Sequence, residues 1–254
     1  MITIGLTYPD FRSRTARAYD VGHYKIVLRL EPASVFPPSE TTIALGEVIQ
    51  RIGATSALDV GTGSGLLSIV LAKAGCPEVV AIDCNPRAIE AALANAARND
   101  VAGCIRGEIA DFRSWQTDRK FDLIVTNPPF VPMPSRAGFI SPEIVTAIDG
   151  GSEGTDSILA FAERATSLLS PEGRLIIPVP HFVRFRAVRR HLSSIYQVQR
   201  IAEREIRYWL AEYDDTFLEF IRKLSGTSEI EIRGEANLLT TTLEILECTI
   251  QAAK

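Results

Sequence analysis

The seven residues Asp59-Val60-Gly61-Thr62-Gly63-Ser64-Gly65, or DVGTGSG, decide the fold of this 254-residue chain. A short apolar run at 57–60 leads into them, and a helix-forming run at 66–74 follows until Gly75. Short apolar runs bounded by glycine are typical of buried strands, and a glycine just past a helical run is a common helix end. The stretch therefore predicts a strand that turns sharply into a helix.

The alternation of strand and helix continues after this turn. Asn85 and Pro86 begin the next helix, because asparagine is a favoured cap and proline favours the first helical position. The predicted strands are 79–82, 104–108, 121–126 and 175–179, and the predicted helices are 86–99, 155–169, which a turn at 170–173 follows, and 182–195. Strands separated by helices predict a mostly parallel sheet that helices cover on both faces. The fold class is therefore α/β, with a doubly wound, Rossmann-like sheet.

The N-terminal part departs from this alternation. Residues 1–34 are predicted to form a short arm with one strand at 24–30. Residues 35–254 form the main domain, which begins with a helix that Ser39 caps and Gly53 ends.

The C-terminal part departs from it as well. A helical segment at 212–224 precedes two strand-like segments at 230–233 and 243–250, which predict an antiparallel edge of the sheet. The stretch 203–226, with Tyr208, Trp209 and Tyr213, is interpreted as an insertion that either closes an acceptor pocket or packs as a helix.

The composition is that of an ordinary globular protein, with 46% hydrophobic residues, 23% charged residues and a net charge of -4. No apolar run approaches the roughly 18 residues that a membrane-spanning helix needs. The four cysteines have neither paired spacing nor a neighbouring histidine, which predicts a cytoplasmic chain without disulfides and without a metal site. The negative charge argues against nucleic-acid binding by phosphate neutralisation alone, and the arginines at 184–190 are interpreted as the solvated face of a helix.

The glycine turn has the features of a site for a nucleotide-like ligand. Gly61, Gly63 and Gly65 allow the backbone to approach a ligand closely at a helix N-terminus, with Thr62 inside the turn. A dinucleotide site prefers G-x-G-x-x-G, whereas these glycines are spaced G-x-G-x-G and follow Asp59, whose carboxylate would repel a pyrophosphate. An acid there suits a ligand with an ammonium and a sulfonium, which indicates S-adenosylmethionine as the cofactor. The alternative is a tight turn without a ligand.

Asp83 follows the second strand of this unit in the stretch AIDCNP, next to Cys84. Its carboxylate can accept hydrogen bonds from both hydroxyls of a ribose, as acids after the second strand do in dinucleotide sites. The alternative is a cap on the following helix, but Asn85 is better placed for that role. Asp83 and Cys84 are therefore predicted to contact the cofactor.

Asp111 and Phe112 follow the third strand and are predicted to contact the adenine ring. The carboxylate of Asp111 can accept the adenine amino group, while the aromatic ring packs against the base. Glu108 is the rival for the acidic role, and a plain surface loop is the alternative to both.

The stretch NPPF, Asn127 to Phe130, comes directly after the strand at 121–126. Two prolines stiffen this loop and leave carbonyl groups without ladder partners, and the Asn127 side chain adds an acceptor oxygen. Asn127 and Pro128 are predicted to take one N–H each from a planar NH₂ group and so to orient its lone pair toward a methyl donor. Phe130 is either a stacking surface for a planar acceptor or a core aromatic. Asn-Pro-Pro is also a good turn sequence without a ligand.

The motifs DVGTGSG, AIDCNP and NPPF together resemble the class I S-adenosylmethionine-dependent methyltransferases, in particular the protein-glutamine methyltransferases that modify peptide release factors. VFPPSET at 35–41 looks like the segment before that family's first helix, and AIDGGSEG at 147–154 looks like its segment after the catalytic loop. The resemblance covers residues 35–180. It implies that Asp59, Gly61, Gly63 and Asp83 hold the cofactor and that Asn127 and Pro128 hold the acceptor nitrogen. The family's usual residue after Asn-Pro-Pro is tyrosine, which this chain replaces with Phe130.

The sequence thus predicts an S-adenosylmethionine-dependent N-methyltransferase that acts on a planar amide or amine nitrogen. A protein glutamine side chain is the first expectation for the acceptor. The alternatives within the same chemistry are adenine in RNA or DNA, with nucleic acid not favoured, and a small nitrogenous metabolite. Two other classes are a silent scaffold that keeps the cofactor fold, and a nicotinamide-dependent oxidoreductase.

Overall fold

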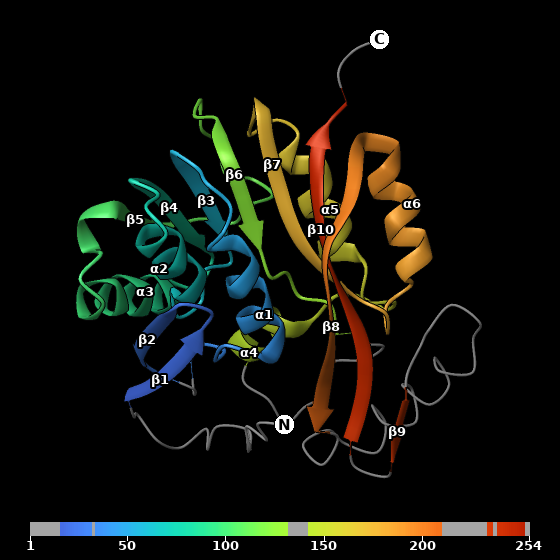
Figure 1. Cartoon of the computed structure of the whole chain (residues 1–254), viewed down its shortest axis with the longest axis horizontal. Helices are drawn as coiled ribbons and strands as arrows, with labels where there is room; N and C mark the ends of the chain where they lie inside the picture. Colours follow the sequence, from blue (N-terminus) through green and yellow to red (C-terminus); the bar gives the residue numbers. More distant parts are fainter. Residues whose placement is uncertain (1–15, 32–33, 132–141, 210–232, 236–237, 252–254) are drawn as a thin grey trace.

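The computed structural model describes residues 16–31, 34–131, 142–209, 233–235 and 238–251. Its centre is one large sheet with strand order β5-β4-β3-β6-β7-β10-β8 (Figure 1). The parallel strands are β3 (Ser56–Val60), β4 (Glu78–Asp83), β5 (Ile105–Ile109), β6 (Phe121–Thr126) and β7 (Leu169–Pro180). The C-terminal strands β8 (Tyr196–Trp209) and β10 (Leu238–Ile250) are antiparallel, and the short β9 (Arg233–Glu235) pairs with β10. The predicted α/β class with an antiparallel C-terminal edge is confirmed.

Helices cover both faces of the sheet. One buried apolar cluster lies between the sheet and the helices α1 (Glu40–Ile49), α2 (Leu66–Lys73) and α3 (Pro86–Arg98). The other lies between the opposite face and the helices α5 (Asp156–Ala165) and α6 (Phe185–Ile195). Neighbouring residues of one strand alternate between the two clusters, as Ala57 and Leu58 of β3 do, because successive side chains in a strand point to opposite faces. Within the described residues the remaining helices are the short η1 (Ala102–Cys104) and α4 (Pro142–Ile148).

The helix starts follow from the sequence. Ser39 caps α1 through a hydrogen bond from Thr42 N to its hydroxyl, and Asn85 caps α3 through a bond from Arg87 N, with Pro86 at the first position. Both caps were predicted, because short polar side chains can accept the backbone N–H groups that a helix start leaves unpaired. The helices α5 and α6 begin one to three residues later than expected, and α5 ends at Ala165 rather than 169.

The described part of the N-terminal arm contains two strands instead of the single one expected. β1 (Ala16–Val21) and β2 (Tyr24–Arg29) form an antiparallel hairpin that packs on α2 and α3. Two buried asparagines, Asn95 within α3 and Asn99 at its C-terminal cap, extend the pairing of β2, because their side-chain amides bond its backbone as a neighbouring strand would. Asn99 bonds Val27 N and O at 3.0 and 2.8 Å, and Asn95 bonds Arg29 N and O at 2.8 and 3.2 Å. β1 was missed because its residues, ARAYDV, alternate only weakly in hydrophobicity.

Two further expectations need correction on the C-terminal side. The segment from Glu203 to Trp209 belongs to the long edge strand β8, so an inserted element does not begin at residue 203. Many charged residues and a shift of register between β8 and β10 disguise the strand's period of two. The expected turn at 170–173 lies within β7, where the register with β6 shifts between Phe121 and Leu123. The predicted helix at 212–224 lies outside the described residues, as do residues 230–232 of the predicted strand.

Candidate functional site

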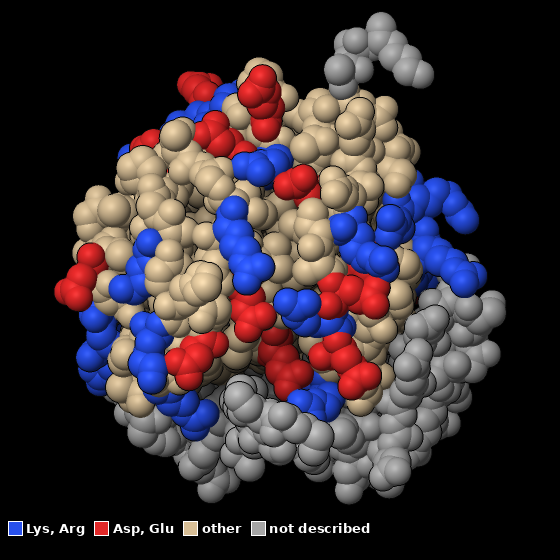
Figure 2. All heavy atoms as spheres, in the orientation of Figure 1, with Lys and Arg blue, Asp and Glu red and all other residues tan. Residues whose placement is uncertain are grey.

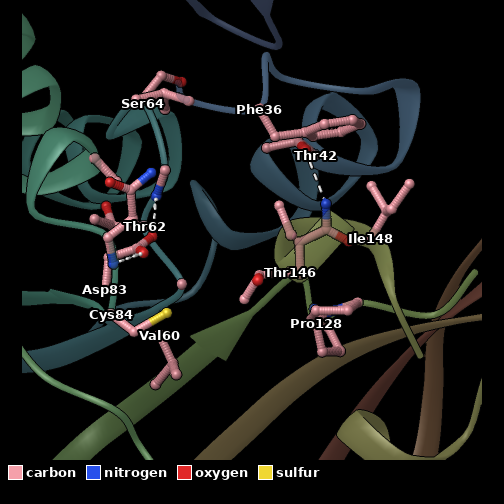
Figure 3. A pocket seen from close by; sticks show the side chains of 18 of the residues that line it. Phe36, Thr42, Val60, Thr62, Ser64, Asp83, Cys84, Pro128, Thr146 and Ile148 are labelled. Carbon is pink, nitrogen blue, oxygen red and sulfur yellow. Dashed lines mark hydrogen bonds between the residues drawn. The ribbon is translucent and has the colours of Figure 1, made fainter. Parts of the chain in front are cut away.

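A cavity of about 830 Å³ lies beyond the carboxyl ends of β3, β4 and β6. Its size falls within the roughly 300–1,000 Å³ of small-molecule sites, and its position is where open α/β sheets bind ligands. Figure 3 shows its lining residues in two groups. One group holds Thr62, Ser64, Asp83 and Cys84, and the facing group holds Phe36, Thr42, Pro128, Thr146 and Ile148. We call these the glycine-turn side and the Asn-Pro side of the cavity.

The glycine turn forms as the sequence predicts. Gly61 and Gly63 have positive φ angles of 70° and 55°, a region that residues with a Cβ rarely adopt. The N–H groups of Gly61 and Thr62 donate to the Ile82 carbonyl at 2.9 and 3.1 Å, which ties the turn to β4. Gly61, Thr62 and Gly63 all line the cavity. The turn therefore presents backbone to the cavity at close range.

Asp59 does not line the cavity, although it was expected to favour a cationic ligand by proximity. Its side chain is fully buried behind the turn, where Oδ2 accepts hydrogen bonds from Thr62 Oγ1 at 2.7 Å, Ser68 Oγ at 2.6 Å and Ser68 N at 3.0 Å. Burial raises the pKa of Asp59 to about 6, against the lowering effect of these bonds. The structure thus gives Asp59 a role in ordering the turn.

Gly65 also lies outside the cavity lining, because it faces the neighbouring helix. Its φ is 86°, and a Cβ at this position would stand 2.8 Å from Ala92 Cα of α3. Only a residue without a side chain permits this close approach of α2 to α3. Gly65 therefore serves packing, and its predicted contact with the cofactor is not supported by its position.

Asp83 and Cys84 line the cavity at the end of β4. One Asp83 oxygen accepts from Gly63 N at 3.0 Å and the other from Asn85 N at 2.9 Å, so the carboxylate bridges the glycine turn and the start of α3. Burial raises the pKa of Asp83, and these two bonds lower it. Each carboxylate oxygen has a further lone pair with which it can accept a ligand hydroxyl.

Asp111 and Phe112 line the same side of the cavity after β5. Phe112 is buried, with its ring 4.9 Å from that of Phe161. Glu108, the rival of Asp111, is absent from the cavity lining and accepts a bond from Trp115 Nε1 at 3.1 Å instead. The structure therefore favours Asp111 over Glu108 as the acid that faces a ligand.

Asn127 and Pro128 stand on the opposite side, at the end of β6. The side-chain nitrogen of Asn127 donates to Thr42 Oγ1 at 2.9 Å, whereas its buried Oδ1 has no donor among the described residues (Figure 3). A buried acceptor without a partner costs roughly 1–3 kcal/mol. The site thus contains an acceptor that a ligand N–H would satisfy.

Phe130 lines the cavity and also belongs to the core. It is 7% exposed, and its ring meets that of Phe182 edge-on at 5.6 Å between centroids. The segment AIDGGSEG lies directly beside it: Val131 pairs with Asp149, and a Cβ on Gly150 would stand 2.7 Å from Phe130 Cα. This segment therefore supports the end of the Asn-Pro-Pro loop.

Several lining residues were not predicted as site residues. They include Phe36, Thr42, Ser64, Thr146, Ile148 and Arg207. Phe36 belongs to the segment VFPPSET at 35–41, whose family resemblance was a usable signal, and Thr42 directly follows that segment. Arg207 is brought in by the edge strand β8, and nothing in its local sequence indicates a cavity. No helix within the described part of the chain is long and apolar enough to cross a membrane.

The chain is similar to several methyltransferases. A Methanocaldococcus jannaschii protein, named as a candidate protein N5-glutamine methyltransferase, is 33% identical over 151 residues, which are 58% of this chain and 73% of that protein. The release factor glutamine methyltransferase of Geobacter sulfurreducens is 32% identical, and the match covers 58% of this chain but only 53% of that enzyme. A tRNA1(Val) (adenine(37)-N6)-methyltransferase of a Flavobacteriaceae bacterium is 34% identical over 97 residues, or 38% of this chain and 42% of that enzyme.

Solved structures confirm the fold. The Thermus thermophilus 16S rRNA N2 G1207 methyltransferase, solved with S-adenosylmethionine and guanosine, superposes with a TM-score of 0.59 at 17% identity, over 93% of this chain and 50% of that one. The model of the methyltransferase small domain family matches residues 39–212, a range that contains residues from both sides of the cavity. The chain therefore belongs to the methyltransferase small domain family and is a class I, S-adenosylmethionine-dependent methyltransferase.

Proposed function

We propose that the chain methylates the side-chain amide nitrogen of a glutamine in a protein. The observation that carries the proposal is the buried Asn127 Oδ1, which has no donor among the described residues and stands beside Pro128 in the cavity wall. A primary amide offers two N–H groups in one plane. Asn127 Oδ1 and the Pro128 carbonyl are acceptors of the kind needed to bind one each.

The residues on the glycine-turn side fit the cofactor. Asp83 has lone pairs for the ribose hydroxyls, Asp111 and Phe112 offer an acid and a ring for adenine, and the turn leaves backbone exposed to the ligand. When bound, S-adenosylmethionine supplies an electrophilic methyl group on a sulfonium. The roles of these side chains are part of the proposal.

The chain's contribution to the reaction is orientation. An amide nitrogen is a weak nucleophile because its lone pair is delocalised into the carbonyl. Two acceptors that hold its N–H groups fix the nitrogen and favour its pyramidal form, in which the lone pair is available. As the new N–C bond forms, the bond between the methyl carbon and sulfur would break and leave its electron pair on a neutral sulfur, and one of the held protons would then leave to water. No histidine stands among the described residues of the cavity wall, which is consistent with a reaction that needs no strong base.

Glutamine is favoured over adenine by charge and by the relatives. The net charge is -4, and on the face in Figure 2 lysine and arginine are interspersed with acids. In the predicted arginine cluster, Arg184 pairs with Glu153 at 2.9 Å and Arg189 with Glu244 at 2.7 Å. Paired arginines offer less attraction to phosphates than free ones. The similar proteins with the longer matches are named for glutamine, whereas the adenine enzyme matches a shorter stretch.

The test uses S-adenosylmethionine with a labelled methyl group and three acceptors in parallel: a purified peptide release factor, transfer RNA and a mixture of small amines. We expect label in the protein, and mass spectrometry should place the methyl group on a glutamine side chain. Label that enters RNA alone, with binding that weakens steeply as salt rises, would replace glutamine with adenine as the acceptor. The Asn127→Ala variant is the negative control for transfer.

A further inference from the structure

A hydroxyl on α1 contacts the residue that is proposed to hold the acceptor. Thr42 lies in the first turn of α1, 85 residues before Asn127 in the chain, yet its Oγ1 is 2.9 Å from Asn127 Nδ2 (Figure 3). The same hydroxyl belongs to the capping box of the helix, in which Ser39 and Thr42 bond each other's backbone. Thr42 Oγ1 therefore takes part both in the cap of α1 and in the hydrogen bonding of Asn127 on the Asn-Pro side of the cavity.

The hydrogen bonds of this hydroxyl can be assigned one by one. Thr42 Oγ1 accepts from Ser39 N at 3.2 Å and from Asn127 Nδ2 at 2.9 Å, which uses both of its lone pairs. Ser39 Oγ lies 3.1 Å from the same oxygen, and either hydroxyl can be the donor of that pair. With Ser39 N and Asn127 Nδ2 on its two lone pairs, Thr42 gives its own hydrogen to Ser39 Oγ.

The structure shows which end of the Asn127 amide faces Thr42. Nδ2 is the atom 2.9 Å from the hydroxyl, so Oδ1 faces away from it and has no donor among the described residues. In the opposite orientation the Thr42 hydroxyl would donate to Oδ1, Ser39 Oγ would become the donor to Thr42, and the acceptor oxygen would no longer be available. The role of Thr42 as an acceptor is therefore what leaves Oδ1 unpaired.

We infer that Thr42, held by Ser39, is a positioning residue that keeps the acceptor oxygen of Asn127 available to the substrate N–H. The inference rests on the proposed function, because it takes the acceptor to be an N–H donor. A helix cap alone needs only the bonds between Ser39 and Thr42. The hydrogen bond from Asn127 Nδ2 to Thr42 Oγ1 adds nothing to the cap. The test must therefore separate the loss of this bond from the loss of the cap.

The test compares three variants. Thr42→Val keeps the branched shape but removes the hydroxyl, Thr42→Ser keeps the hydroxyl, and Ile43→Ala removes a half-buried apolar side chain of the same helix turn outside the cavity lining. We expect Thr42→Val to lower kcat about ten- to hundredfold with little change in cofactor Kd, since one preorganised contact to the reacting group is lost. Thr42→Ser should return kcat to within a few-fold of the parent protein, and Ile43→Ala should leave it nearly unchanged despite a lower Tm.

The inference is overturned if Thr42→Val keeps kcat within about twofold of the parent, or if Ile43→Ala lowers kcat equally at a matched loss of Tm. A second measurement does not need the acceptor. Side-chain amide protons of Asn127, assigned by NMR from their loss in Asn127→Ala, should exchange faster in Thr42→Val and remain protected in Thr42→Ser. Unchanged exchange in Thr42→Val would also overturn the inference. If exchange responds but the parent methylates no glutamine, the proposed acceptor is wrong while the positioning by Thr42 stands.

Discussion

The two sides of the cavity differ in how their polar groups are satisfied and in how far apart in sequence their partners lie. On the glycine-turn side, bonds join residues close in sequence, such as Asp59 to Thr62 and Ser68, and Gly63 to Asp83. On the Asn-Pro side, the bond that orients Asn127 comes from Thr42, 85 residues away, and the acceptor Oδ1 is left without a donor among the described residues. A local network in which Asp59 Oδ1, outside the cavity lining, is the unpaired atom suits a preformed cofactor site. An unpaired acceptor in the cavity wall suits a group that must be captured from outside.

The largest effect should come from the unsatisfied acceptor. In Asn127→Ala the acceptor oxygen is removed, and we expect kcat to fall about 10²- to 10³-fold, the usual cost of one preorganised polar contact to the reacting group. The Kd of S-adenosylmethionine, measured by calorimetry, should change little, because the glycine-turn side stays intact. Equal losses in kcat and in cofactor affinity would show that the two sides of the cavity are not separable.

A smaller effect, on cofactor affinity rather than on kcat, should come from a change at Asp83. Asp83→Asn replaces one acceptor oxygen with a donor and removes the charge, so we expect the cofactor Kd to weaken about 10- to 100-fold, as for one or two hydrogen bonds to a charged group. At saturating cofactor, kcat should stay within a few-fold of the parent. Glu108→Gln is the matched control, because Glu108 precedes the same site in sequence but does not line the cavity. A similar loss in Glu108→Gln would contradict the assignment of the ribose site to Asp83.

The contrast between the two sides also explains what the sequence could predict. The sequence predicted the glycine turn DVGTGSG, the strand end AIDCNP and the start of α3. Each of them depends on neighbours a few residues away, so strand, turn and cap can be recognised within one stretch. The fold class followed from the repeated alternation of strands and helices. Asn127 and Pro128 were predicted because two prolines and an asparagine side chain directly after a strand have local consequences for the loop.

The parts that sequence reasoning missed depend on tertiary contacts. Thr42 looks like an ordinary helix-cap residue until β6 is placed beside α1. Asp59 and Gly65 were read as ligand contacts because a motif gives the order of residues but not which side of the turn each one faces. The edge strand β8, which brings Arg207 to the cavity, carries too many charges for its period to be visible.

Gly61 and Gly65 lie in the same turn but differ in what surrounds them, so they can be compared directly. A Cβ at Gly65 would meet Ala92 Cα at 2.8 Å, whereas a Cβ at Gly61 would meet nothing within 4 Å. Gly65→Ala should therefore lower the free energy of unfolding by about 2–3 kcal/mol, from overlap added to backbone strain. Gly61→Ala should cost only about 1 kcal/mol of strain but should weaken cofactor binding, because Gly61 lines the cavity.

Urea denaturation of both glycine variants without cofactor measures the stability, and calorimetry measures the affinity. We expect Gly65→Ala to be the less stable variant. If Gly61→Ala proved less stable instead, the close approach of α2 to α3 could not be the main reason for a glycine at position 65.

The smallest expected effect is a change of stability with pH, and it concerns Asp59 behind the glycine turn. Its Oδ1 has no donor among the described residues. Burial raises the pKa of Asp59 to about 6 in the folded chain from an ordinary value of 3.8. The folded state thus holds this proton more tightly than the unfolded state, so the contribution of Asp59 to stability is fully present below about pH 4 and is lost as pH rises through about 6. Between about pH 5 and pH 7 the loss should amount to about 1 kcal/mol, which urea denaturation without cofactor can resolve.

Because other carboxyl groups titrate too, the quantity to follow is the difference in unfolding free energy between the parent and Asp59→Asn, which cannot titrate at this position. A difference that stays constant over this range would mean that Asp59 is already ionised behind the turn, and that the glycine-turn side holds a buried charge rather than a proton.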